Sequence, residues 1–131
     1  MSLRQSRPHV LFRTDGDPEI GMGHVMRCIA LAERFAEKKS PSIFLLKYYT
    51  PQVLDIIRTQ GFEVEVLSAE TIEPDAQLTL SIIQKYNCSM MITDLSHLRT
   101  FEDLLSHQEY LLILRQNNIF IITLDGLLED R

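Results

Sequence analysis

Short apolar stretches alternate with longer amphipathic stretches along the whole chain. The short ones have the length and composition of buried strands, and the long ones repeat apolar residues at helical spacing. The expected strands cover residues 9–14, 42–47, 62–67, 89–94 and 119–125, and the expected helices cover residues 23–38, 51–60, 74–86 and 101–116. Pro51 and Pro74 stand at helix starts, and Gly61 stands where a helix should stop. Because strands separated by helices need crossover connections, the pattern predicts a mainly parallel sheet covered on both faces.

This order of elements is typical of a Rossmann-like three-layer α/β domain. The stretch 62–67 alternates apolar and acidic residues, which predicts a strand with one wet face at the edge of the sheet. Residues 9–131 are expected to form one such domain. Residues 1–8 are expected to be an extension, and the first three of them are consistent with a cloning remnant.

The charge balance and the apolar runs exclude several classes of partner. The formal net charge of −5 leaves no basic surface for nucleic acid. No apolar run approaches the roughly 20 residues of a membrane-spanning helix, and the amino terminus lacks the apolar segment of a signal peptide, so we expect a cytoplasmic protein that does not bind membranes. Cys28 and Cys88 form no CxxC pair or Cys/His cluster, which predicts reduced, largely buried thiols and no zinc.

Polar residues follow three of the expected strands. Asp15 and His24 follow the first strand, Asp94 ends a later one, and Asp125 ends the last. The carboxyl ends of parallel strands meet at one edge of the sheet, where open α/β domains bind ligands. We therefore expect these side chains to share one rim.

The glycine-rich turn between residues 16 and 23 does not match the common nucleotide motifs. Gly16 and Gly21 have the glycine spacing of a P-loop, but Met22-Gly23 stands where lysine and a hydroxyl residue are needed. Gly21 and Gly23 match only two glycines of the dinucleotide fingerprint, and the second strand ends without an acidic residue for a ribose. A response-regulator receiver would need a lysine after the last strand, where this chain has Asp125-Gly126.

What remains is a tight turn that lets backbone amides approach a ligand, with His24 at the start of the following helix. A helix amino terminus favours anions and disfavours an imidazolium, and a neutral imidazole can accept a proton as a general base. Asp15 or Asp17 could orient the ring. The alternative is that His24 caps the helix or hydrogen-bonds a neighbouring loop.

The string FRTDGDPEIGMGHVMRCIALA resembles the amino-terminal signature of a known family. Its matching residues are Arg13 and Asp15, the run from Ile20 to His24, and then Arg27 and Leu31-Ala32. The family comprises the UDP-diacetamido-trideoxy-altrose hydrolases of pseudaminic acid biosynthesis and related spore-coat polysaccharide biosynthesis proteins. The specific match covers about 20 residues, and beyond it the likeness rests on element order and on acidic residues at strand ends.

The resemblance implies one half of a GT-B-like fold, in which a second Rossmann-like domain holds most of the nucleotide. It implies removal of the nucleotide from a UDP-linked sugar, with His24 as the base that activates water at the anomeric carbon. Gly21 and Gly23 would lie against the sugar and diphosphate, and Asp15 would position the sugar or the histidine. The scheme requires no metal and no cofactor.

The chain departs from the family pattern in three places. Asp94-Leu95-Ser96 replaces an Asp-x-Tyr element, and Asp125-Gly126 replaces a paired aspartate. The nucleotide-binding half is absent from these 131 residues, so we expect a fragment, or a chain that is inactive alone and needs a partner subunit or a homodimer. A second function class consistent with the sequence is a noncatalytic module that binds a carbohydrate or nucleotide sugar, and a third is an interaction domain whose rim clusters are only structural.

Individual side chains have both functional and structural interpretations. Arg13 is expected to pair with Asp15 or Asp17 rather than bind phosphate, and Arg27 suits ligand contact and surface pairing equally. Asp94 is predicted to bind substrate or, alternatively, to cap the loop that follows it. The other three histidines are expected to have no special role: His9, His97 and His107.

Overall fold

The computed structural model describes residues 8–68, 72–95 and 101–124. Its strands are β1 (His9–Thr14), β2 (Ser42–Leu46), β3 (Glu63–Val66), β4 (Cys88–Asp94) and β5 (Ile121–Thr123). Its helices are α1 (Gly23–Glu37), α2 (Pro51–Thr59), α3 (Ile72–Lys85) and α4 (Phe101–Gln116). The alternation of strands and helices predicted from the apolar pattern is confirmed.

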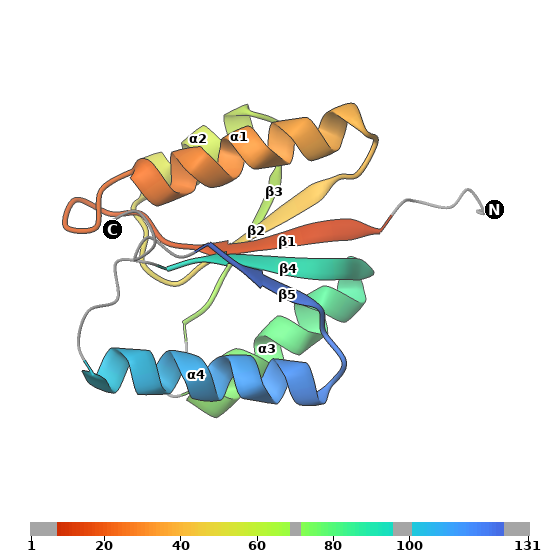
Figure 1. Cartoon of the computed structure of the whole chain (residues 1–131). Helices are drawn as coiled ribbons and strands as arrows, with labels where there is room; N and C mark the ends of the chain where they lie inside the picture. Colours follow the sequence, from red (N-terminus) through yellow and green to blue (C-terminus); the bar gives the residue numbers. More distant parts are fainter. Residues whose placement is uncertain (1–7, 69–71, 96–100, 125–131) are drawn as a thin grey trace, which may run out of the picture.

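The five strands form one all-parallel sheet in the order β3-β2-β1-β4-β5. Helices α1 and α2 cover one face of the sheet, and α3 and α4 cover the other (Figure 1). This is the expected Rossmann-like three-layer arrangement. The alternating strand β3 lies at a sheet edge, as its acidic and apolar pattern predicts.

Each face of the sheet has its own apolar core, because successive side chains of a strand point to opposite faces. Val10 and Phe12 of β1 pack with α1 and α2, whereas Leu11 packs with α3 and α4. The same alternation continues to the carboxyl ends of the strands, and it decides on which side of the sheet each polar residue there points.

Two element boundaries differ from the sequence prediction. Helix α3 begins at Ile72, two residues before Pro74, because proline is tolerated in the first turn of a helix. The last strand covers only Ile121–Thr123. The amide of Ile119 donates to the carbonyl of Leu114, so Ile119 still belongs to the turn that closes α4.

Among the described residues, no helix is long and apolar enough to cross a bilayer. The cysteines are free, as expected, with Cys28 buried and Cys88 half-buried. Burial raises the pKa of the Cys28 thiol to about 12, with Asp94 contributing, and that of Cys88 to about 11. Both thiols are therefore protonated and unreactive near neutral pH.

Candidate functional site

Asp94 is the centre of a polar cluster at the carboxyl edge of the sheet. It ends β4 and points to the α1 side, and its side chain has no solvent exposure. Oδ1 accepts a hydrogen bond from Nδ1 of His24 at 2.9 Å. Arg27 binds both carboxylate oxygens, with Nε 2.8 Å from Oδ2 and Nη2 2.8 Å from Oδ1. We call Asp94, His24 and Arg27 the Asp94 cluster.

The hydrogen bond from His24 to Asp94 defines the chemistry of the imidazole. A carboxylate can only accept hydrogen bonds, so Nδ1 of His24 must be the donor. A neutral imidazole protonated on Nδ1 carries its lone pair on Nε2. The side chain of His24 is 20% exposed, so the ring lies at the rim and not in the aliphatic interior.

Arg27 compensates the charge that burial of Asp94 would otherwise leave unpaired. The fork of its guanidinium matches the two carboxylate oxygens, which is the strongest geometry for such a pair. Thr14 adds a further tie, because its hydroxyl donates to the backbone carbonyl of Asp94 at 3.1 Å. The cluster therefore joins β1, β4 and the first turns of α1.

The glycines of the preceding turn have different physical roles. Gly16 is required by packing, because a Cβ there would lie 2.8 Å from Cγ2 of Val25. Gly21 has φ +87°, a conformation that other residues adopt only at a cost. At Gly23, a Cβ would meet nothing within 4 Å, so the protein's own atoms do not exclude a side chain there. Because Gly23 has no side chain, a ligand can approach the backbone at the start of α1 closely.

The turn before α1 has contacts of its own in addition to the Asp94 cluster. Met22 is the N-cap residue and makes no side-chain capping hydrogen bond. Asp17 shapes the turn, because its Oδ1 accepts from the amides of Glu19 and Ile20. The side chain of His24 bonds Asp94, 70 residues away in the sequence, and so ties the start of α1 to the end of β4.

Asp15 makes its hydrogen bonds with Arg13 and with the segment after β2. Its Oδ1 accepts from Nη1 of Arg13 at 2.9 Å and from the amides of Lys47 and Tyr48 at 2.8 and 3.1 Å. The aspartate that orients Nδ1 of His24 is Asp94, and Asp15 ties the segment after β2 to the end of β1. The pairing of Arg13 with Asp15 is confirmed.

The role expected for Asp94 also changes with the structure. A side chain without solvent exposure and with both oxygens occupied by His24 and Arg27 offers no surface to a substrate. Asp94 is a positioning residue for the histidine. Arg27, at 37% side-chain exposure, combines this internal pairing with a partly open surface. Asp125, Gly126, Ser96 and His97, which the sequence analysis also considers, lie outside the described residues.

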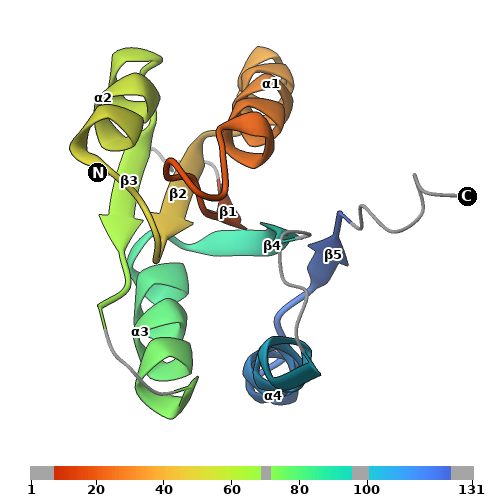
Figure 2. The same cartoon turned by 90° about the vertical axis from the view of Figure 1, so that its left-hand side faces the viewer.

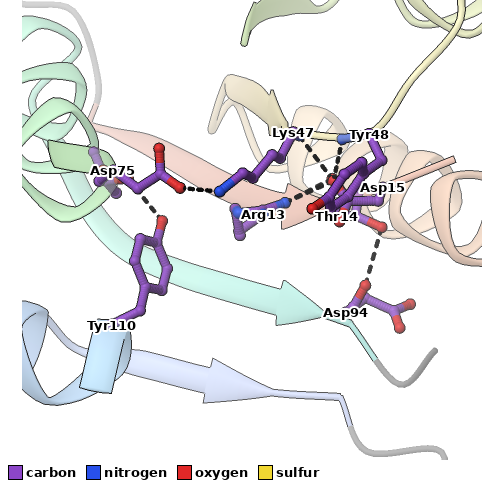
Figure 3. Close-up of polar contacts among 9 residues, drawn as sticks. Arg13, Thr14, Asp15, Lys47, Tyr48, Asp75, Asp94 and Tyr110 are labelled. Carbon is purple, nitrogen blue, oxygen red and sulfur yellow. Dashed lines mark hydrogen bonds and ion pairs between the residues drawn. The ribbon is translucent and has the colours of Figure 1, made fainter. Parts of the chain in front are cut away.

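A second polar site lies on the opposite face of the sheet, between β1, α3 and α4 (Figure 3). Residues that sequence reasoning missed contribute to it, namely Lys47, Asp75 and Tyr110. Lys47 forms an ion pair with Oδ2 of Asp75. His107, expected to be an ordinary surface residue, lines this cavity and stacks on the ring of Tyr110. The sequence carries no motif for this site, because its residues come from separate elements.

Among the residues described, no group of three or more histidine, cysteine, aspartate or glutamate side chains could hold a metal ion.

No protein-family model, curated protein or solved structure matches this chain.

Proposed function

We propose that this chain is the sugar-facing domain of a UDP-sugar hydrolase or related glycosyltransferase-like enzyme of surface polysaccharide or nonulosonic acid biosynthesis. The observation that carries the proposal is the hydrogen bond from Nδ1 of His24 to the buried carboxylate of Asp94. A buried aspartate that fixes the tautomer of a rim histidine is the arrangement that prepares an imidazole to act as a general base. The amino-terminal resemblance supplies the substrate class.

In the proposed reaction, Nε2 of His24 takes a proton from water as the water oxygen attacks the anomeric carbon. The bond between that carbon and the diphosphate oxygen breaks, so UDP leaves and the sugar keeps the new hydroxyl. Asp94 stabilises the imidazolium that forms, and Arg27 holds Asp94 in place. The proposal includes no metal or cofactor, because amides at the Gly21–Gly23 turn and the start of α1 are suited to the developing charge of the leaving group.

The proposal includes a partner that completes the site: a second domain, another subunit or a second copy of the chain. Exposed apolar side chains on α4 and around β5 support it, namely Leu104, Leu105, Leu112, Phe120 and Ile122. Exposed apolar surface of this kind often marks a site where another protein binds.

The test is release of UDP from UDP-N-acetylglucosamine, followed by ³¹P NMR at high protein concentration in ¹⁸O-labelled water. We expect His24→Asn to lower turnover by about 10²-fold or more while binding of the UDP-sugar is preserved. Asp94→Asn should lower turnover as well, because it removes the carboxylate that sets the tautomer. The label should appear on the sugar and not on the diphosphate.

His9→Asn is the matched control, because His9 lies at the opposite end of β1 from the site. Equal turnover in His24→Asn and the parent protein would remove the catalytic assignment. Binding of the UDP-sugar without turnover, in the parent chain assembled with the partner that completes its site, would instead favour the noncatalytic binding module.

A further inference from the structure

The cavity between β1, α3 and α4 is a second site, separate from the Asp94 cluster. Its volume is about 110 Å³, and its walls include Arg13, Asp15, Lys47, Tyr48, Asp75 and Tyr110. None of the three residues of the Asp94 cluster lines it. Arg13 and Asp94 point to opposite faces of the sheet, because Arg13 shares its side with Leu11 and Asp94 lies against α1. Seen from the carboxyl edge of the sheet, α3 and α4 lie on the side opposite α1 (Figure 2).

Internal hydrogen bonds hold the walls of this cavity in place. The hydroxyl of Thr79 donates to the carbonyl of Asp75 at 2.8 Å. Thr79 has only one hydrogen to donate, so the hydroxyl of Tyr110 donates to Thr79 across 2.6 Å. Burial raises the pKa of Tyr110, which keeps that hydroxyl protonated. Figure 3 shows Asp75, Lys47, Arg13 and Asp15 following one another along the cavity.

Two buried polar atoms of these walls lack hydrogen-bond partners within the described part of the chain. They are Oδ1 of Asp75, an acceptor, and Nε of Arg13, a donor. Both side chains are more than nine-tenths buried. Buried polar groups are almost always hydrogen-bonded, and leaving them unpaired costs free energy. A ligand in the cavity that reached both atoms would have to donate to Asp75 and accept from Arg13.

The charges of the walls favour a neutral occupant. Arg13 and Lys47 would repel a cation, whereas Asp15, Asp75 and the exposed Asp103 would repel a phosphate. A hydroxyl group donates to a carboxylate and accepts from a guanidinium without carrying charge. One hydroxyl of a ligand would donate to Asp75, and another would accept from Arg13.

The remaining walls add an apolar surface to these polar ones. Tyr48 is 51% exposed and lines the cavity, together with the buried Leu67 and Leu95. The face of an aromatic ring packs well against the C–H face of a sugar ring. A volume of about 110 Å³ equals the space of roughly four water molecules, so a monosaccharide would insert one edge and keep the rest outside.

We propose that this cavity is a binding site for a small neutral polyhydroxylated ligand, a monosaccharide or the end of a glycan, recognised through Asp75, Arg13 and the ring of Tyr48. The site goes beyond the proposed hydrolysis, because its residues do not include the base. It would place an acceptor or product sugar at the same edge of the sheet as His24 but on the other face.

The test is titration of the ¹⁵N-labelled full chain with glucose and with N-acetylglucosamine, followed by NMR. We expect saturable shifts around Lys47, Asp75 and Tyr110, with a Kd in the millimolar range. Asp75→Asn should weaken binding about tenfold or more, since a hydrogen bond to a charged group is lost. Tyr48→Ala should weaken it by about threefold to tenfold, and it keeps the test valid if Asp75→Asn does not fold.

Tyr49→Ala is the matched control, because Tyr49 is a partly exposed neighbour that does not line the cavity. His24→Asn should leave sugar binding unchanged, which separates this site from the proposed catalysis. Inorganic phosphate should cause no saturable shifts at the cavity. Saturable phosphate shifts there, unchanged affinity in both Asp75→Asn and Tyr48→Ala, or no saturable binding of either sugar would each overturn the proposal and leave the cavity to water.

Discussion

Asp94 carries a negative charge at a position without solvent exposure, and Arg27 is the cation that makes this position tolerable. A buried charge that loses its partner is far more costly than an exposed pair, because neither water nor another cation replaces the lost interaction. The stability of the domain and the orientation of His24 therefore depend on the same carboxylate.

We expect Arg27→Ala to lower the free energy of unfolding by about 3 kcal/mol, because Asp94 stays buried without its bidentate partner. Arg27→Lys should recover only part of this loss, since an ammonium cannot bind both oxygens in the same fork. Urea unfolding followed by circular dichroism measures both effects.

Arg34→Ala is the control for this prediction, because Arg34 lies on the same helix with a largely exposed pair to Glu37. It should change stability by less than about 1 kcal/mol. A loss for Arg27→Ala no larger than that for Arg34→Ala would contradict the role given to the Asp94 pair.

The helices of this domain all end in the same way, although their sequences differ at that point. A residue with positive φ follows each helix: Lys39, Gly61, Asn87 and Asn118. After α1, the amide of Ser40 donates to the carbonyl of Phe35 and that of Lys39 donates to Ala36, which is a Schellman closure. Glycine or asparagine suits this conformation, whereas lysine adopts it at a cost.

Lys39→Gly should therefore raise the free energy of unfolding by about 0.5 to 1 kcal/mol, because it removes the steric cost of φ +66°. Thermal unfolding would show a higher midpoint. Lys38→Gly is the neighbouring control, with φ −95°, and should bring no gain. A stability gain at residue 38 and none at residue 39 would contradict the assignment of the strain.

The ion pair between Glu65 of β3 and Lys85 of α3 joins an edge strand to the end of a helix. Nζ of Lys85 lies 2.9 Å from Oε2 of Glu65, which also accepts from the hydroxyl of Tyr86. The Lys85 hydrogen bond holds the pKa of Glu65 below its ordinary value of 4.5, although partial burial acts in the opposite direction. A carboxylate with a lowered pKa contributes stability above its unfolded value, and that contribution is lost as the pH falls through the folded value.

Glu65→Gln should consequently lower the unfolding midpoint slightly at pH 7, and the difference from the parent should disappear in acid, below the folded pKa of Glu65. Glu63→Gln, at an exposed position of the same strand, is the control for loss of one carboxylate that has no ion pair to Lys85. Denaturant titrations at several pH values measure both variants. A deficit of Glu65→Gln that persists or grows in acid would contradict the linkage.

As a whole, the molecule leaves apolar side chains uncovered on consecutive elements. Leu105 and Leu112 of α4 are exposed, as are Phe120 and Ile122 at the edge strand β5. Figures 1 and 2 both place α4 beside β5. An edge strand next to exposed apolar residues is a surface prone to association.

We expect this protein to self-associate with increasing concentration, and the double variant Leu105→Ser/Leu112→Ser to reduce the association. Analytical ultracentrifugation gives the weight-average mass of each. Leu78→Ser, an exposed leucine on α3, serves as the control. A parent chain that stays monomeric at all concentrations would argue that its partner is a different domain or subunit, and not a second copy.

The pattern of the chain determined most of the architecture by itself. Element order, parallel pairing and the edge position of β3 follow from local periodicity, since a strand or an amphipathic helix shows its buried face in its own residues. The turn that places His24 at the start of α1 was predicted equally well, because its glycines lie next to the strand and the helix in the sequence. The boundaries of α3 and β5 were predicted less well. The exact start of a helix near a proline, and the length of the turn that closes a helix, depend on neighbouring segments.

Only the tertiary structure decided which charged groups meet. Asp15 is nine residues from His24, yet Nδ1 of His24 bonds Asp94, which ends a strand 70 residues away. Asp75 lies on α3, Tyr110 lies on α4 and Lys47 directly follows β2, and nothing in the sequence near any of them indicates the other two. The physical reason is that a strand directs alternate side chains to opposite faces, so the identity of a partner depends on sheet order and register, which are set by long-range packing rather than by neighbours in the chain.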